Sequence, residues 1–344
     1  MKKVRIGIIG AGTVGQVHIE NLITRIPSAK LEVVVDSAPE LTESWMFRKG
    51  FNVPLTGNPE DLFQNPEIDG VLICSSEDTH AAFIMEAAKN GKHVFCGMPT
   101  DHDAGMAIEA ICAMIHAGLL MQVGFSRRFD VRHTRLHNFI REGYLGKPTM
   151  VRISSKSSYT PNPKNLHEEE DDLIFFNSTI HDFDMLRYIT GCEVEELYVK
   201  CGHLGEWTFP TKAYDTAVIM LKLDNGAIAT IENSWQCKIG HDQRIEVIGK
   251  RGIASSENLL YDGFRFQNAE HGEHSRIHKF WYERYHAALL AELEHFVNCL
   301  LTGDVPRVTG YDSIQALMLS YAARKSCREN HPVQVEDIKR QYGL

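Results

Sequence analysis

Long apolar runs, an excess of basic charge and paired cysteines are what this sequence of 344 residues lacks. No apolar run approaches the roughly 20 residues that a membrane-spanning helix needs, so we expect no membrane segment and no membrane partner. The formal net charge is -9, which argues against a nucleic-acid or polyanion binder, because such proteins present a basic face. A local basic pocket for a small anionic ligand is compatible with this charge.

The cysteines bear on where the protein works. There are eight of them, but no Cys-x-x-Cys pair occurs and their spacing is irregular. We interpret them as buried free thiols in a reducing compartment. The N-terminal Met1-Lys2-Lys3 leads straight into an apolar run, unlike a secretory signal peptide. We therefore expect a cytoplasmic protein, and we predict no metal site.

Length and patterning predict two domains, the first covering residues 1–125. In this part short apolar runs alternate with helical patterns, which predicts a parallel sheet covered on both faces. Right-handed crossovers make such a sheet doubly wound. The expected strands are Val4–Ile9, Leu31–Val35, Val71–Cys74, His93–Cys96 and Leu120–Val123, and the clearest helices are Thr79–Lys89 and Gly105–Ala117.

The pattern changes in residues 126–344, where we expect an α+β domain. A connecting helix at Val131–Glu142 precedes longer strands with short turns, which favours a mostly antiparallel sheet. Asn225-Gly226 predicts a hairpin turn between two of these strands. The expected strands are Met150–Ser154, Glu195–Lys200, Thr216–Leu223, Ala227–Trp235 and Arg244–Ile248, and the expected helices are His181–Ile189, Glu283–Leu301 and Ser313–Arg328, the last two packing back on the assembly.

A glycine-rich turn, Gly10-Ala11-Gly12-Thr13-Val14-Gly15, follows the first strand and opens a helix. In that context the pattern indicates a dinucleotide-binding loop. Gly10 permits the tight turn, Gly12 lets the backbone approach a pyrophosphate, and Gly15 lets helix and strand pack closely. The phosphates would bind at the helix N-terminus, together with Thr13 and Val14. The alternative is a glycine-rich turn that binds no ligand.

Asp36 ends the second strand, 21 residues after Gly15. A carboxylate at this place accepts hydrogen bonds from the ribose hydroxyls and repels a 2′-phosphate, so we predict NAD rather than NADP as the cofactor. The alternative is a solvated aspartate of the Asp36-Ser37-Ala38-Pro39 turn.

The loop after the third strand runs from Ser75 to His80. Because loops at the carboxyl ends of parallel strands face the ligand, we predict that Ser75, Thr79 and His80 contribute to cofactor binding. Asp78 or Thr79 could equally cap the next helix, a role that we favour for Asp78.

Seven segments in this order resemble the glucose–fructose oxidoreductase/inositol 2-dehydrogenase family (Gfo/Idh/MocA) over nearly the whole chain. They are G-A-G-T-V-G (10–15), D-T-H (78–80), G-K-H-V-F-C (91–96), Q-V-G-F-S-R-R-F-D (122–130), I-H-D-F-D-M-L-R-Y (180–188), N-G-A (225–227) and E-L-E-H-F-V (292–297). Two of these segments, Q-V-G-F-S-R-R-F-D (122–130) and I-H-D-F-D-M-L-R-Y (180–188), resemble the inositol 2-dehydrogenases in particular within the family.

The resemblance implies a fold, a reaction and an assembly. Members join a Rossmann domain to an α+β domain with a large open sheet, and that sheet often mediates homodimers or homotetramers. They typically oxidise a secondary alcohol of a cyclic polyol or sugar with a nicotinamide cofactor. The resemblance also implies that Gln122 contributes to the cofactor site and that Arg127 and Lys156 contribute to the substrate site. A surface position is the alternative for Lys156.

The chain departs from the family at the expected chemical site. Relatives carry Glu-Lys-Pro where this sequence has Gly97-Met98-Pro99. Their lysine contacts the substrate hydroxyl, whereas the thioether of Met98 can neither donate a hydrogen bond nor carry charge. Relatives also carry an aspartate four residues before the motif histidine, and here this residue is Asn177. Asn177 can orient His181 without stabilising its charge, or it is the N-cap of the following helix.

His181 is retained, and the resemblance implies that it accepts the substrate's hydroxyl proton; a structural histidine is the alternative. We interpret the neighbouring acidic residues, Asp182 and Asp184, as solvated or capping groups. One of the two arginines before Asp130 is expected to line the cleft between the domains and the other to pair with Asp130. Three further histidines on helical patterns are expected at the surface: His116, His133 and His137.

The sequence therefore predicts an NAD-dependent dehydrogenase acting on a polyol or sugar. The intact Gly10, Gly12, Gly15, Asp36 and His181 favour an enzyme. The departures at Met98 and Asn177 favour the first alternative, an NAD-binding paralogue with impaired or no turnover. The second alternative is an enzyme that uses the cofactor for redox-assisted epimerisation or elimination on a sugar.

Overall fold

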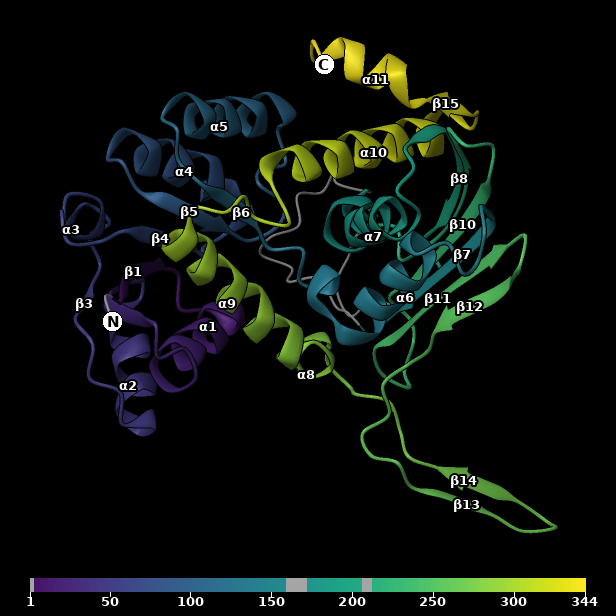
Figure 1. Cartoon of the computed structure of the whole chain (residues 1–344), viewed down its shortest axis with the longest axis horizontal. Helices are drawn as coiled ribbons and strands as arrows, with labels where there is room; N and C mark the ends of the chain where they lie inside the picture. Colours follow the sequence, from purple (N-terminus) through teal and green to yellow (C-terminus); the bar gives the residue numbers. More distant parts are fainter. Residues whose placement is uncertain (1–2, 159–171, 206–211) are drawn as a thin grey trace. The chain divides into compact units, whose positions relative to one another are not determined.

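The computed structural model describes residues 3–158, 172–205 and 212–344. The chain forms two compact units (Figure 1). The first comprises the residues up to Phe129 together with Ala287–Gln315, and the second comprises Asp130–His286 with Ala316–Leu344. Within the described residues, no helix has the length and apolar character to cross a membrane.

The first unit is built on a parallel sheet that has six strands in the described part of the chain, in the order β3-β2-β1-β4-β5-β6. This is the strand order of a doubly wound dinucleotide-binding fold, so the predicted fold class is confirmed. The predicted strands differ from the observed ones by at most a few residues at their ends. The strands are β1 (Val4–Ile9), β2 (Ala29–Val35), β3 (Leu55–Thr56), β4 (Gly70–Ile73), β5 (His93–Cys96) and β6 (Met121–Val123).

Helices cover both faces of this sheet (Figure 1). The helices α1 (Thr13–Thr24), α2 (Pro39–Lys49) and α9 (His286–Thr302) share one apolar core with β1 and β2. The helices α4 (His80–Lys89) and α5 (Ala104–His116) pack against each other on the other face, and α4 contacts β4 and β5. Because neither face meets water, the strands read as continuous apolar runs, and β4 is buried along its whole length.

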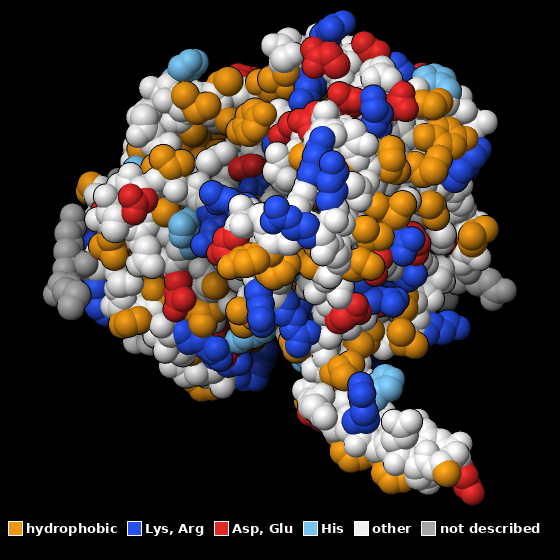
Figure 2. Space-filling view, turned by 45° about the vertical axis from the view of Figure 1, so that its right-hand side comes forward, with side chains coloured by type: hydrophobic (Ala, Val, Ile, Leu, Met, Phe, Trp, Pro, Cys, Tyr) orange, Lys and Arg blue, Asp and Glu red, His pale blue; other side chains and the backbone are white. Residues whose placement is uncertain are grey.

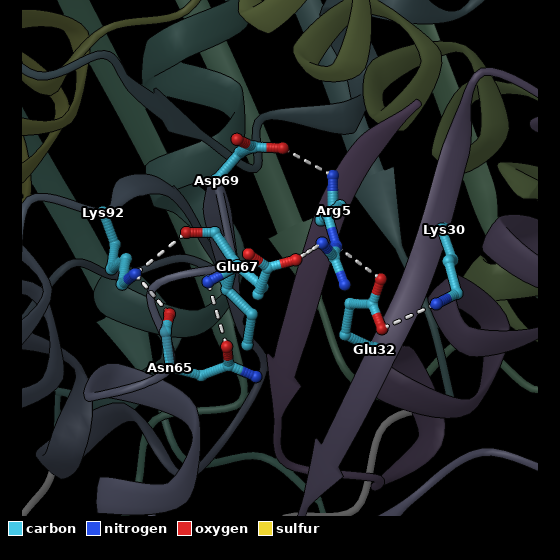
Figure 3. Close-up of polar contacts among 8 residues, drawn as sticks. Arg5, Lys30, Glu32, Asn65, Glu67, Asp69 and Lys92 are labelled. Carbon is cyan, nitrogen blue, oxygen red and sulfur yellow. Dashed lines mark hydrogen bonds and ion pairs between the residues drawn. The ribbon is translucent and has the colours of Figure 1, made fainter. Parts of the chain in front are cut away.

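Polar contacts connect residues near the amino ends of the strands, at the opposite end of the sheet from the glycine-rich turn (Figure 3). The guanidinium Nε of Arg5 donates to Glu32 at 2.7 Å, and the Arg5 backbone N–H donates to Asp69 at 2.8 Å. The buried ammonium of Lys92 donates to two backbone carbonyls before β4, at 2.6 and 2.9 Å. Desolvation lowers the pKa of Lys92, and the nearby Asp69 carboxylate opposes that shift. The network therefore fixes the strands where no ligand is expected.

The second unit contains a mixed sheet that has seven strands in the described residues, in the order β12-β11-β7-β10-β9-β8-β15. Every neighbouring pair is antiparallel except β7 and β10, which confirms the mostly antiparallel sheet. The predicted Asn225-Gly226 turn joins β9 to β10, with Gly226 at φ +84°. The strands are β7 (Pro148–Lys156), β8 (Val194–Gly202), β9 (Thr216–Leu223), β10 (Ile228–Ser234), β11 (Asp242–Gly249), β12 (Gly252–Ser256) and β15 (Val333–Gln334).

Inward and outward side chains alternate along these strands. The inner face packs against helices that include α7 (Ile180–Thr190), as Figure 1 shows, and the outer face stays exposed. Strands β13 (Arg265–Gln267) and β14 (Gly272–His274) form a separate hairpin, exposed at every residue. The remaining helices are α3 (Glu60–Phe63), α6 (Val131–Arg141), α8 (Trp281–Arg284), α10 (Gly310–Glu329), which begins in the first unit, and α11 (Val335–Gln341).

Three predicted surface groups are buried. His133 was expected at the surface but is fully buried, where it bonds to Ser256 at 3.0 Å. Asp182 and Asp184 were expected in solvent or at a cap, and both are 0% exposed. These predictions were wrong because helical periodicity does not reveal which polar residue faces a packed neighbour.

Two further predictions, the arginine partner of Asp130 and the free state of all cysteines, are also wrong. Asp130 bonds to the buried Arg284 at 2.6 Å, whereas Arg128 pairs with Asp312 at 2.8 Å. Cys201 in β8 and Cys327 in α10 form a disulfide, with 6.4 Å between their Cα atoms. The interpretation of all cysteines as free thiols is therefore wrong for this pair, which stands 126 residues apart, while the other cysteines are free.

Candidate functional site

The glycine-rich turn closes over the end of β4. A Cβ atom on Gly10, at φ +93°, would lie 2.5 Å from the carbonyl oxygen of Cys74, and one on Gly15 would collide with the carbonyl of Gly10. A Cβ on Gly12 would meet nothing within 4 Å. The fold itself therefore requires Gly10 and Gly15, whereas Gly12 leaves open space of the kind that a closely approaching phosphate fills.

The N-terminus of α1 opens at the same place. Gly12 is its N-cap and makes no side-chain cap bond. Within the described chain, the N–H groups of Gly12, Thr13 and Val14 have no acceptor, and Gly12 and Thr13 are exposed. Unpaired amides together with the helix dipole favour an anion. The turn therefore fits the pyrophosphate of a dinucleotide.

Asp36 joins the end of β2 to the glycine-rich turn. One carboxylate oxygen accepts from the Ala11 N–H at 2.6 Å, and the other accepts from the Ala38 N–H at 2.8 Å. The bond to Ala38 is the turn contact of the alternative interpretation, but the bond to Ala11 spans 25 residues and fixes the carboxylate beside the turn. Each oxygen retains a lone pair, so the carboxylate can also accept from ribose hydroxyls.

The loop after β4 is held by its own hydroxyls. The side-chain oxygens of Ser75 and Thr79 lie 2.7 Å apart, and the Thr79 hydroxyl donates to the carbonyl of Ser76 at 2.6 Å. Asp78 is exposed within a 3₁₀ turn, Glu77–Thr79, and makes no side-chain cap bond, so its predicted capping role is wrong. Ser75 and Thr79 thus lie at the carboxyl end of β4 as predicted, whereas their contact with the cofactor stays a prediction.

His80 connects the ends of two strands. Its Nδ1 lies 2.7 Å from the carbonyl oxygen of Pro99, and its Nε2 lies 3.1 Å from that of Ser75. The side chain is buried, and both ring nitrogens contact the protein. These contacts favour a role for His80 in holding the loops after β4 and β5 together, and direct contact with the cofactor stays a prediction.

Gln122 and Arg127 lie deeper in the first unit than we expected. Gln122 is buried in β6, and its Nε2 donates to the backbone carbonyl of Glu292 in α9 at 2.8 Å. Its Oε1 has no partner among the described residues. Arg127 is buried in the 3₁₀ turn Ser126–Phe129 that follows β6. The predicted ligand roles of both residues stay untested.

Met98 lies after β5 and contacts the start of α10. The hydroxyl of Ser313 lies 3.6 Å from the Met98 sulfur, to which it donates, and 2.6 Å from the hydroxyl of Thr100. A Cβ on Gly97 would lie 3.5 Å from the His80 ring. The segment Gly97–Pro99 is held by Ser313 at the Met98 sulfur and by His80 at the Pro99 carbonyl, but the Met98 thioether can only accept a hydrogen bond.

In the second unit the helical backbone begins before Asn177. Phe175–Thr179 forms a π turn that continues into α7, so Asn177 lies inside the helix and the N-cap alternative is wrong. Its Oδ1 is buried without a partner in the described residues. His181 is the second residue of α7 and is half-buried. π turns occur often at functional sites, but no local pattern in the sequence indicated this one.

Lys156 is the last residue of β7. It lies on the strand face opposite to the buried Ser155, and its Nζ is 3.3 Å from a carboxylate oxygen of Glu232. The ion pair favours the surface alternative for Lys156, and its predicted substrate role stays untested. No group of three or more His, Cys, Asp or Glu that could hold a metal occurs among the described residues.

Sequence reasoning missed a buried polar cluster beneath α7. Ser155, Asn233 and Gln243 lie on three adjacent strands, and all three bond to Asp182. A signal was present, since each is a polar residue at a strand position whose alternation predicts an inward side chain.

Open amides, a carboxylate after β2 and a doubly wound sheet together define a dinucleotide-binding protein of the Rossmann class. Residues 4–125 match the model of the oxidoreductase family with an NAD-binding Rossmann fold. Residues 133–255 match the model of the GFO/IDH/MocA C-terminal domain. The chain belongs to the Gfo/Idh/MocA family of oxidoreductases, and NAD as the cofactor class is confirmed.

Similar proteins match this chain over nearly its whole length. The myo-inositol 2-dehydrogenase of Thermotoga maritima is 35% identical, over 97% of this chain and 99% of its own length. The scyllo-inositol 2-dehydrogenase (NAD(+)) of Bacillus subtilis is 31% identical, over 99% and 98%. The crystal structure of a probable dehydrogenase from Thermotoga maritima superposes with a TM-score of 0.92 at 34% identity, over 97% of this chain and 100% of that chain. These names favour a dehydrogenase over the two alternatives.

Proposed function

We propose that this oxidoreductase oxidises a secondary alcohol of a cyclic polyol, of the inositol type, or of a sugar. The observation that carries the proposal is the retention of His181 on α7 in a chain with an open glycine-rich turn. The dehydrogenase names of full-length relatives support the substrate class.

The residues of the chain divide the work between binding and proton transfer. The amides at the start of α1 bind the phosphates, and Asp36 accepts hydrogen bonds from the adenosine ribose. Bound NAD supplies the hydride acceptor. His181 accepts the hydroxyl proton at a ring nitrogen, directly or through water. We assign Asn177, four residues earlier, the orientation of the imidazole in the loaded enzyme, for which its buried Oδ1, without a partner among the described residues, supplies an acceptor.

Met98 and Asn177 separate this chain from its inositol-oxidising relatives. A lysine at position 98 would donate a hydrogen bond and stabilise a developing alkoxide, and Met98 does neither. We therefore expect weak or no activity on myo-inositol itself. The favoured substrate is a related polyol or sugar whose oxidation depends less on that donor.

A panel assay tests the proposal directly. NADH formation is followed with inositols, their amino derivatives and common sugars. On the best substrate, His181→Ala should lower kcat by about 10²–10⁴-fold, the usual range for loss of a general base, with nearly unchanged NADH affinity. The matched control is His116→Ala, at an exposed position in α5. Absence of turnover throughout the panel would reject the substrate class, and full activity of His181→Ala would reject the proton-transfer role.

The outer face of the second unit's sheet supports an oligomer, and we include a homodimer or homotetramer through this face in the proposal. Exposed apolar side chains stand on it among charged ones, on the side that Figure 2 brings forward. They are Met150, Val218, Met220, Ile228 and Ile253. Sedimentation should give a dimer or tetramer that Met220→Asp dissociates and that Leu41→Asp, on the exposed side of α2, leaves intact. A monomeric parent protein would contradict this part.

A cytoplasmic location also belongs to the proposal. It was predicted from free thiols, and the Cys201–Cys327 disulfide weakens that argument for one pair. Cell fractionation with the native chain tests it, and recovery outside the cytoplasm would overturn it.

A further inference from the structure

Asp182 follows His181 directly in α7 and faces the sheet of the second unit. Its side chain is 0% exposed. A carboxylate in such a place needs hydrogen-bond donors, because an unsatisfied buried charge is costly. The donors come from three different strands.

Both carboxylate oxygens of Asp182 are engaged. Oδ1 accepts from the Ser155 hydroxyl at 2.5 Å and from Nε2 of Gln243 at 3.3 Å. Oδ2 accepts from Nδ2 of Asn233 at 2.7 Å. The strand residues are also linked to their surroundings, since Gln243 donates to the Ser155 hydroxyl at 2.6 Å and the Thr179 hydroxyl donates to Asn233 at 2.5 Å.

The strand register places the three donors in one row. Ser155 of β7 stands opposite Asn233 of β10 and opposite Gln243 of β11. The neighbouring row on the same face is apolar throughout and consists of Ile153, Ile231 and Ile245. Apolar contacts are non-directional, whereas hydrogen bonds require a defined distance and angle. The polar row therefore specifies how far along the sheet and at what rotation α7 sits.

We propose that Asp182 is the positioning residue of the site: through Ser155, Asn233 and Gln243 it fixes the first turn of α7 and thereby His181. This inference rests on the proposed function, in which His181 accepts the proton. It assigns Asp182 no contact with substrate or cofactor. Its effect is on the placement of the adjacent imidazole.

A charge swap separates placement from charge. In Asp182→Asn the new side chain keeps one oxygen acceptor and replaces the other by an N–H₂ group. If the oxygen keeps the bonds from Ser155 and Gln243, the N–H₂ group faces the Nδ2 donor of Asn233, and this donor loses its acceptor. In the double variant Asp182→Asn with Asn233→Asp, position 182 still accepts from Ser155 and Gln243 and now donates to the new carboxylate. Each of the hydrogen bonds described above between position 182 and the three strand residues again joins a donor to an acceptor, although the negative charge has moved to β10.

The expected results concern kcat more than KM. Asp182→Asn should lower kcat by about 10²-fold, the cost of a small misplacement of a catalytic group, with KM for NAD unchanged. The swap should restore most of kcat. Asp262→Asn, in an exposed loop, is the matched control. A swap that folds but stays as slow as Asp182→Asn would overturn the proposal. Ser155→Ala, which retains the carboxylate, replaces Asp182→Asn if that variant does not fold, and full kcat in it would also overturn the proposal.

A second readout needs no substrate. Hydrogen–deuterium exchange should be faster in the first turn of α7 in Asp182→Asn and should return to the parent rate in the swap. Unchanged exchange in Asp182→Asn would overturn the inference. If no polyol or sugar is oxidised, the proposed function fails, and the exchange measurement still decides whether the network positions α7.

Discussion

His18 lies one helical turn after Gly15 in α1, with its side chain buried against the sheet. Its ring meets Phe95 edge to face, with 5.3 Å between the ring centroids. Its Nδ1 has no hydrogen-bond partner among the described residues. Because burial disfavours the charged imidazolium, the pKa of His18 falls from 6.5 to about 4.

The shift makes folding stability depend on pH. Between the two pKa values the unfolded chain binds a proton at His18 that the folded protein does not, so stability rises with pH through this window. The contribution of neutral His18 to the free energy of unfolding is fully present above the unfolded-state pKa of 6.5. It is lost as the pH falls through the window down to the folded-state pKa of about 4. The full gap corresponds to about 3 kcal/mol, and at about pH 5 the loss is about 2 kcal/mol.

Urea unfolding at about pH 7.5 and about pH 5 measures this loss. The parent protein should lose about 2 kcal/mol more than His18→Gln between these conditions, because glutamine does not titrate. His116→Gln, at an exposed position, should behave like the parent. Burial lowers the pKa of His93 and His295 in the same direction, but both residues are present in all three proteins and cancel. Parallel losses in parent and His18→Gln would refute the reasoning.

Three further predictions follow. Titration calorimetry should show that the parent protein binds NADH more tightly than NADPH, and Asp36→Ala should reduce this difference in affinity. Equal or tighter binding of NADPH by the parent protein would contradict the assignment of Asp36 as the residue that selects NAD. Met98→Lys combined with Asn177→Asp should increase the rate of myo-inositol oxidation by more than the two single changes together. A positioned donor contributes roughly 3–4 kcal/mol to a transition state, but a buried lysine without a carboxylate partner has a lowered pKa and can lose its charge. Strong myo-inositol turnover by the parent protein would show that another group replaces the lysine. Cys201→Ser should lower the free energy of unfolding by about 2–4 kcal/mol under oxidising conditions, and a reducing agent should abolish the difference; equal stability in both states argues against the crosslink.

Much of the site follows from local pattern alone. The strands of the first unit were predictable because their apolar runs are continuous, and a strand covered on both faces has no other composition. The glycine-rich turn was predictable because Gly10 and Gly15 each occupy a position that a Cβ would block. Such constraints act between residues close in sequence or within one strand–turn–helix unit, so the sequence carries them directly. Strands as short as β3 and β15, with two residues each, are too short to show a period.

The tertiary structure decided which polar residues meet. Asp182 resembles a solvated helix residue until β7, β10 and β11 bring Ser155, Asn233 and Gln243 beneath it. Cys201 and Cys327 become partners only because α10 returns to β8. The period of a strand tells which residues share a face, but not which face is covered or by what. That choice depends on contacts between segments many residues apart, and only the assembled fold determines them.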